Sequence, residues 1–203
     1  MAAGLVAGSF FSAQAQTPTF NLQMTGICDS MINSEWRNNQ WNVSNYILFD
    51  LDADDYLLEM RSRDSLGDAQ YRLVFTRNAN DDATEANIWV KFGGSFINYA
   101  RTTFTYDANQ NMIFEASKTL FPVPADQERY TYTYDANDYL IGSIRERYQS
   151  VTWEKSLRTT YTNNANGQPT ETIEESWNAS INDWMYMQKT STNYNAAGKE
   201  LSW

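Results

Sequence analysis

The stretch Tyr132-Thr-Tyr-Asp135-Ala-Asn137-Asp138 recurs along the chain and decides the fold. We number each copy from its first Asp or Asn, so that Asp135 is position 0 and Tyr132 is position −3. Position 0 falls on the following residues: Asp52, Asn78, Asp107, Asp135, Asn164 and Asn195. A spacing of 26 to 31 residues is typical of a repeat protein, and six units cover most of the chain.

Each copy predicts a hairpin turn, because Asp or Asn accepts a hydrogen bond from the backbone two residues on, and Asn or Gly supplies a positive φ. The flanking residues alternate with period 2, which indicates strands. Aromatic residues occupy odd positions, notably −3 and −11, whereas Thr at −2 and Arg or Lys at −6 occupy even positions. We therefore expect one aromatic face, mainly core, and one solvated face.

A period of about 29 residues accommodates two strands and two short turns. The predicted fold is all-β, with six long antiparallel hairpins and about twelve strands in a curled or spiral single sheet that closes or stays open. Residues 41–203 form this repeat domain, and residues 16–40 form an N-terminal segment or cap that blunts one edge. Residues 1–15 resemble a signal peptide ending in Ala13-Gln14-Ala15, which predicts an exported protein at the cell surface or secreted.

The composition excludes several classes of function. With 15 Lys and Arg against 25 Asp and Glu, the net charge of −10 argues against nucleic acid as a partner. The absence of histidine excludes Ser-His-Asp and Cys-His catalysis and His-ligated zinc. The lone Cys28 cannot close an intrachain disulfide. No apolar stretch is long enough for a transmembrane helix, and no cofactor or metal is predicted.

The motif Tyr-Thr-Tyr-Asp-Ala-Asn resembles the YD repeats of Rhs and teneurin-type extracellular proteins. It looks still closer to the Tyr-Asp-x-Asn-Gly repeats of secreted and surface proteins of Bacteroidota. The resemblance covers residues 36–201 and implies a strip of β-hairpins in an extracellular setting. The period is longer than in typical YD repeats, and six units are too few for a large shell that encloses a toxin.

Two sets of side chains are candidate binding sites. Three tryptophans near hairpin ends can stack on sugar rings, although regular aromatics also fill a sheet core: Trp36, Trp177 and Trp184. A basic column at position −6 can bind an acidic polysaccharide: Arg72, Arg101, Arg129, Arg158 and Lys189. The alternative for the column is cross-strand pairing with acidic residues at position +7: Glu59, Glu85 and Glu171.

Acidic residues raise two further possibilities. Asp50, Asp52 and Asp54 have the oxygen ligands that Ca²⁺ prefers, but they lie in a repeat turn that already explains Asp at position 0. Glu174 and Glu175 cannot form a glycosidase pair, because adjacent residues of a strand face opposite sides of the sheet.

We predict that the protein is not an enzyme and that it acts as a surface or extracellular scaffold, adhesin or assembly module. Its partners would be further copies of itself, joined at edge strands, or glycans of the envelope or extracellular space. One alternative is a glycan-binding module that uses exposed Trp and Tyr. Another is an outer-membrane β-barrel, which would need an apolar residue at every second position of its lipid face.

Overall fold

A computed structural model of the chain describes residues 30–37, 40–54 and 56–201. The signal peptide predicted at residues 1–15, Cys28 and residues 16–29 of the predicted cap lie outside the described residues, as does the side chain of Trp36. Within the described ranges no helix has the length and apolar character needed to cross a membrane.

The described chain forms fourteen strands. Their bounds are β1 Ser30–Arg37, β2 Gln40–Leu51, β3 Leu57–Asp64, β4 Ala69–Arg77, β5 Ala83–Phe92, β6 Ser95–Tyr106, β7 Met112–Thr119, β8 Ala125–Tyr134, β9 Leu140–Gln149, β10 Thr152–Asn163, β11 Pro169–Asn178, β12 Asp183–Ser191, β13 Asn193–Tyr194 and β14 Glu200–Leu201.

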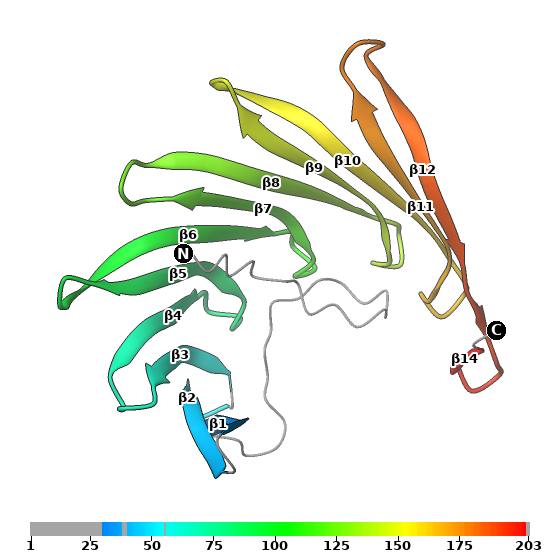
Figure 1. Ribbon diagram of the computed structural model, residues 1–203. Helices are drawn as coiled ribbons and strands as arrows, with labels where there is room; N and C mark the ends of the chain where they lie inside the picture. The colour runs from blue at the N-terminus through cyan, green and yellow to red at the C-terminus, as the bar shows by residue number, and fades with distance from the viewer. Residues whose placement is uncertain (1–29, 38–39, 55, 202–203) are drawn as a thin grey trace. The chain divides into compact units, whose positions relative to one another are not determined.

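Strands β1 to β12 form a single antiparallel sheet in which every strand pairs with its neighbours in the sequence (Figure 1). Strands β13 and β14 form a separate two-stranded sheet. Among the described strands β1 does not pair with β12, so the sheet is not closed. The predicted all-β array of about twelve strands in consecutive hairpins is therefore confirmed.

Two compact units divide the described chain. The N-terminal unit comprises the described residues up to Thr131 together with Ile144–Ser156. The C-terminal unit comprises Tyr132–Ser143 and the residues from Leu157 onward. Every contact described below lies within one of these units.

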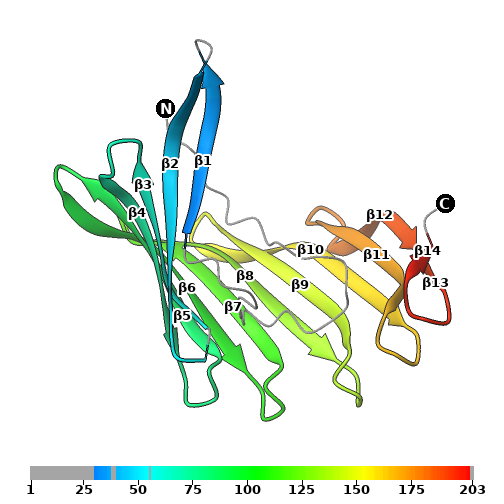
Figure 2. The same ribbon diagram turned by 90° about the horizontal axis from the view of Figure 1, so that it is seen from below.

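The six turns that begin at position 0, which we call Asx turns, share one geometry. The side-chain Oδ1 of residue 0 accepts hydrogen bonds from the backbone N–H groups of residues +2 and +4, at 2.9 to 3.1 Å. The backbone N–H of residue 0 donates to the carbonyl of residue +4. Figure 2 shows two of these turns side by side, joining β4 to β5 and β6 to β7.

The residue with positive φ in the described Asx turns lies at +3, and it is one of the following: Asp81, Gln110, Asp138, Gly167 and Gly198. The prediction that Asn supplies the positive φ is therefore wrong for the Asn at +2. The reason is that the N–H of residue +2 bonds to the Oδ1 of residue 0, which leaves the reversal of the chain to the next residue.

A β-bulge recurs eight residues before position 0. One residue in each of five strands is skipped in the pairing with the preceding strand: Ser44, Gln70, Tyr99, Gln127 and Met187. An extra residue inverts the alternation of side chains, because that alternation has period 2. Position −11 therefore lies on the same face as position −6, and the predicted separation of the two is wrong: the Arg158 guanidinium lies 4.9 Å from the Trp184 ring centroid.

The core lies near the Asx turns, in rows that run from repeat to repeat. Positions −3 and +5 hold side chains that are at most 7% exposed: Leu57, Phe75, Ala83, Phe104, Met112 and Leu140. The predicted burial of the aromatic residues at −3 is thus observed for Phe75 and Phe104. These core positions lie in one sheet, so side chains of adjacent repeats bury one another.

A hydrogen bond also joins each of four repeats to the one before it. The side chain at −1 donates to the carbonyl at +5 of the preceding repeat, at 2.8 to 3.1 Å: Arg77 to Leu57, Tyr106 to Ala83, Asn163 to Leu140 and Tyr194 to Pro169. We call this hydrogen bond between repeats the joint. Burial at the joint raises the pKa of Tyr106 to about 12, because the phenolate is disfavoured there. Three different side chains thus make the same joint.

Candidate functional site

The basic column is paired with carboxylates along its whole length. Arg72 forms a two-pronged contact with Glu59, through Nε at 2.6 Å and Nη2 at 3.0 Å. The remaining ion pairs are Arg101 with Glu85, Arg129 with Glu146, Arg158 with Glu175 and Lys189 with Glu171. Glu59, Glu85 and Glu171 are the partners named by the cross-strand alternative, whereas Glu146 and Glu175 were not anticipated.

Aromatic rings complete the column. The guanidinium carbon of Arg72 lies 5.6 Å from the centroid of Phe96, and that of Arg129 lies 4.5 Å from the centroid of Trp153. Arg72, Arg129 and Arg158 thus each contact a carboxylate on an adjacent strand and a ring two strands away. An acidic polysaccharide would have to displace a carboxylate to reach any of these cations.

The carboxylates of two of these pairs have a pKa below the ordinary value for Glu. The hydrogen bond from Arg72 lowers the pKa of Glu59, and the hydrogen bond from Arg158 lowers the pKa of Glu175, in both cases against the effect of burial. The pairs are structural in their effect, because a carboxylate held ionised by arginine is not poised to donate a proton near neutral pH.

These shifts predict the acid stability of the protein. Glu59 and Glu175 have a lower pKa in the folded protein than in the unfolded chain. Their ionised forms therefore stabilise the fold fully above the unfolded pKa of Glu, and this stabilisation is lost as the pH falls through the folded pKa. We expect urea unfolding midpoints that are flat from about pH 5.5 to pH 8, because no histidine titrates there, and that fall below about pH 4.5.

The substitution Glu59→Gln should lower stability by about 0.5 to 1 kcal/mol at pH 7 and reduce the acid-side loss. The exposed Glu154→Gln serves as the matched control and should change neither. If the urea midpoint of Glu59→Gln fell at low pH as much as that of the wild type does, the pair would not contribute to acid stability.

Two of the three candidate tryptophans can be placed. Trp177 and Trp184 face each other across β11 and β12, with ring centroids 5.1 Å apart and an interplanar angle of 70°. Both side chains are half-buried. Because the Trp184 ring also lies against Arg158, its environment is that of a packed cross-strand pair.

Two of the three aspartates considered for calcium have other roles. Asp50 forms an ion pair with Arg61 at 2.6 Å, and Asp52 is position 0 of the first Asx turn. Within the described ranges no group of three or more carboxylate, cysteine or histidine side chains could hold a metal ion.

The loops opposite the Asx turns differ from them in sequence and surface. In the N-terminal unit four successive loops expose one apolar side chain each, in the loop itself or at the strand end that enters it: Leu66 at 88%, Phe92 at 65%, Val123 at 70% and Val151 at 87%. Figure 1 shows the first three of these loops together at one end of the strands, joining β3 to β4, β5 to β6 and β7 to β8. We call this set the apolar loop row. By contrast, the tips of the Asx turns carry Ala, Asn, Asp, Gln and Gly.

Two features set the apolar loop row apart, one in the backbone and one in the side chains. Val151 has a φ of 72°, a conformation that a β-branched residue rarely adopts. The rings of Phe92 and Phe121 meet between two neighbouring loops, with centroids 5.8 Å apart. Strained backbone and exposed apolar side chains are features of binding loops on rigid scaffolds.

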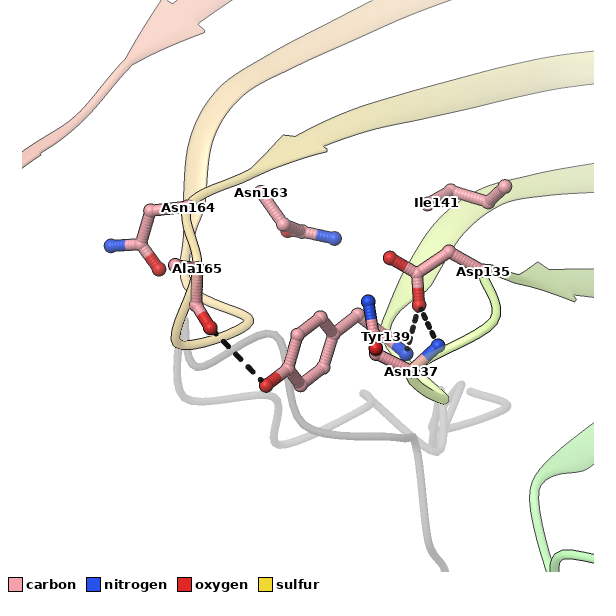
Figure 3. A pocket seen from close by; sticks show the side chains of 7 residues that line it. All are labelled: Asp135, Asn137, Tyr139, Ile141, Asn163, Asn164 and Ala165. Atoms are coloured by element: carbon pink, nitrogen blue, oxygen red, sulfur yellow. Dashed lines mark hydrogen bonds between the residues drawn. The ribbon is translucent and has the colours of Figure 1, made fainter.

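A hollow opens between two consecutive Asx turns of the C-terminal unit. Its lining consists of Asp135, Asn137, Tyr139, Ile141, Asn163, Asn164 and Ala165. Figure 3 shows the Tyr139 ring lying across from its own turn to the next one, where its hydroxyl donates to the Ala165 carbonyl at 3.5 Å. We call this feature the Tyr139 hollow.

Sequence reasoning missed both the apolar loop row and the Tyr139 hollow. The signal for the hollow is a departure from the repeat: position +4 holds Tyr139, where the flanking copies have Asn111 and Gln168. The loop row has no such signal, because its loops vary in length and composition.

No protein-family model matches the chain. No protein of curated function matches its sequence either. Among solved structures, a protein of unknown function from Bacteroides fragilis shares 13% identity and a TM-score of 0.48, over 61% of this chain and 92% of that one. A DUF3836 family protein from Parabacteroides distasonis shares 18% identity and a TM-score of 0.36, over 44% and 88% of the two chains.

A porin-like protein from Bacteroides uniformis shares 12% identity and a TM-score of 0.46, over 78% of this chain and 74% of that one. These likenesses concern β-rich folds and carry no information about activity.

Proposed function

We propose that this chain is an exported, non-enzymatic repeat scaffold of the YD type. It binds a partner at the bacterial surface through the apolar loop row. The observation that carries the proposal is the contrast between the two ends of the hairpins. One end repeats a single closed turn, whereas the other presents an apolar side chain on each of four successive loops.

The free energy of folding gains little from these side chains, which supports a role for them in binding. Leu66 and Val151 are almost fully exposed and therefore gain little from folding, while each leaves apolar surface in water. Single exposed apolar residues are ordinary, but their recurrence on four successive loops of one end is typical of an interaction site.

The repeat motif and the charge support the setting. The resemblance to YD repeats and to surface proteins of Bacteroidota points outside the cell, as does the signal-like sequence at residues 1–15. A net charge of −10 makes attraction to anionic phosphate surfaces unfavourable, so an apolar contact is the better way to hold a partner.

Retention at the surface tests this function. In a Bacteroidota host we expect the full chain to be exported, to start at Gln16 and to remain with the cells. A variant in which Leu66, Phe92, Val123 and Val151 are each changed to Ser should be released into the medium and stay folded, with the lost Phe92–Phe121 ring contact as its main cost in stability. Changing Ala53, Ala79 and Ala108 to Ser, at exposed tips of Asx turns of the same unit, is the matched control and should leave the protein cell-bound.

Two results would contradict the proposal. One is an intracellular wild-type protein, and the other is a loop variant that stays with the cells as well as the control does.

A further inference from the structure

The Tyr139 hollow arises because one Asx turn lacks the closure found in its neighbours. In the turn that begins at Asp107, the Asn111 amide donates to the second carboxylate oxygen at 3.2 Å. In the turn that begins at Asn164, the side-chain amide of residue 0 donates to Gln168 at 3.1 Å. At position +4 of the intervening turn Tyr139 cannot make this bond, because its hydroxyl reaches the next turn instead.

Two acceptors are left open in the hollow. Oδ1 of Asp135 accepts from the N–H groups of Asn137 and Tyr139, and among the described residues no donor contacts its Oδ2. Asn163 donates through Nδ2 to the Leu140 carbonyl, while its Oδ1 is buried without a hydrogen-bond partner among the described residues. The cost of a buried acceptor without a donor applies to Asn163 Oδ1 alone, and a ligand relieves it when the Asn163 side chain turns toward the hollow.

Figure 3 shows that Asp135 and Asn163 extend toward the same space, with the Tyr139 ring beside it. The lining combines one carboxylate, three amides and one phenol ring. Amides both donate and accept, which matches hydroxyl groups, whereas an ammonium ion could use only the acceptors. An aromatic ring beside such groups offers an apolar surface to the C–H face of a sugar ring.

We propose that the Tyr139 hollow is a binding site for a neutral sugar ring, with one hydroxyl group donating to Asp135 Oδ2 and another donating to Asn163 Oδ1 once that side chain has turned toward the ligand. This inference does not depend on the proposed function, because the hollow lies in the C-terminal unit and uses no residue of the apolar loop row. It also differs from the predicted tryptophan sites, since it contains neither Trp177 nor Trp184.

Other repeats provide substitutions that should close the hollow without harming the fold. Tyr139→Asn restores the side chain of Asn111, whose amide bonds the second oxygen of Asp107. Asn163→Tyr restores the side chain of Tyr106 and Tyr194, whose hydroxyls donate to the same kind of carbonyl as Asn163 does. The matched controls are Tyr186→Asn and Asn193→Tyr, at exposed positions of the same unit.

Titration of the ¹⁵N-labelled full chain with D-glucose, D-galactose, D-mannose and N-acetyl-D-glucosamine tests the site. A monosaccharide in a small open site binds at about 1 mM or weaker, so the titration should extend to about 0.1 M. We expect at least one sugar to shift the amide signals of Asn137, Asn163, Asn164 and Ala165 together. Tyr139→Asn and Asn163→Tyr should each weaken this binding by about tenfold or more, while both controls bind as the wild type does.

Three outcomes would overturn the inference. The first is the absence of shifts with every sugar. The second is unchanged binding in folded Tyr139→Asn and Asn163→Tyr proteins. The third is a response to methylammonium but to none of the sugars, which would make the hollow a cation site. Because these readouts use purified protein, they are independent of export and of the apolar loop row.

Discussion

Replacing Gly167 with alanine is expected to lower the free energy of unfolding by about 3 kcal/mol. A Cβ at this position would lie 2.4 Å from Cδ1 and Cε1 of the Tyr139 ring, far inside van der Waals contact. The residue also has a φ of 76°, which alone costs an alanine about 1 kcal/mol. The two costs add because the ring is held by its bond to the next turn.

Gly198 provides the matched control. It has a φ of 74°, but the nearest atom to an added Cβ is Nε2 of Gln168 at 3.2 Å, which donates to the Gly198 carbonyl and needs to move by only a few tenths of an ångström. Gly198→Ala should therefore show only the backbone cost of about 1 kcal/mol in urea unfolding followed by circular dichroism. Combining Gly167→Ala with Tyr139→Asn should reduce its cost to the same value. Equal effects of the two single substitutions would mean that the ring contact is unimportant.

Met112→Ala should have an effect of similar size, about 3 kcal/mol, for a different reason. Met112 occupies position +5 and is fully buried at 0% exposure, so its truncation leaves a cavity that adjacent strands cannot fill.

Two comparisons make the Met112 measurement decisive. Met112→Leu keeps the volume, matches Leu57 and Leu140 at the same repeat position, and should cost less than about 1.5 kcal/mol. Leu66→Ala, in an exposed loop, should change stability by less than about 0.5 kcal/mol. If Met112→Ala behaved like Leu66→Ala, position +5 would not be a core position.

The hairpins could be predicted from the sequence because the Asx turn is a local structure. Its hydrogen bonds join residues two and four apart, so Asp135 and its counterparts determine each turn with little help from the rest of the chain. The order of the strands followed, since consecutive hairpins with short connections pair with their neighbours.

The distribution of side chains between the two faces could not be predicted in the same way. The bulge at position −8 falls on Ser, Gln, Tyr and Met residues, which share no property that marks a bulge. One unmarked residue inverted the expected alternation and brought position −11 to the face that carries position −6.

The binding features depend on contacts between repeats, which a single motif does not encode. The Tyr139 hollow needs a tyrosine at +4 of one repeat and an asparagine at −1 of the next. The pairing of Arg72 with Glu59 likewise joins position −6 of one repeat to position +7 of the repeat before it. Only the registry of neighbouring hairpins brings such residues together.

The joint between position −1 and the carbonyl at +5 bears on how such a chain can change in evolution. The acceptor is a backbone atom present in every residue, and the donor has been an arginine, a tyrosine or an asparagine. Loss or duplication of a whole unit at the level of the gene would therefore leave an intact joint on both sides. Genes for proteins built in this way can change length by whole hairpins while each surviving unit keeps its neighbours' contacts.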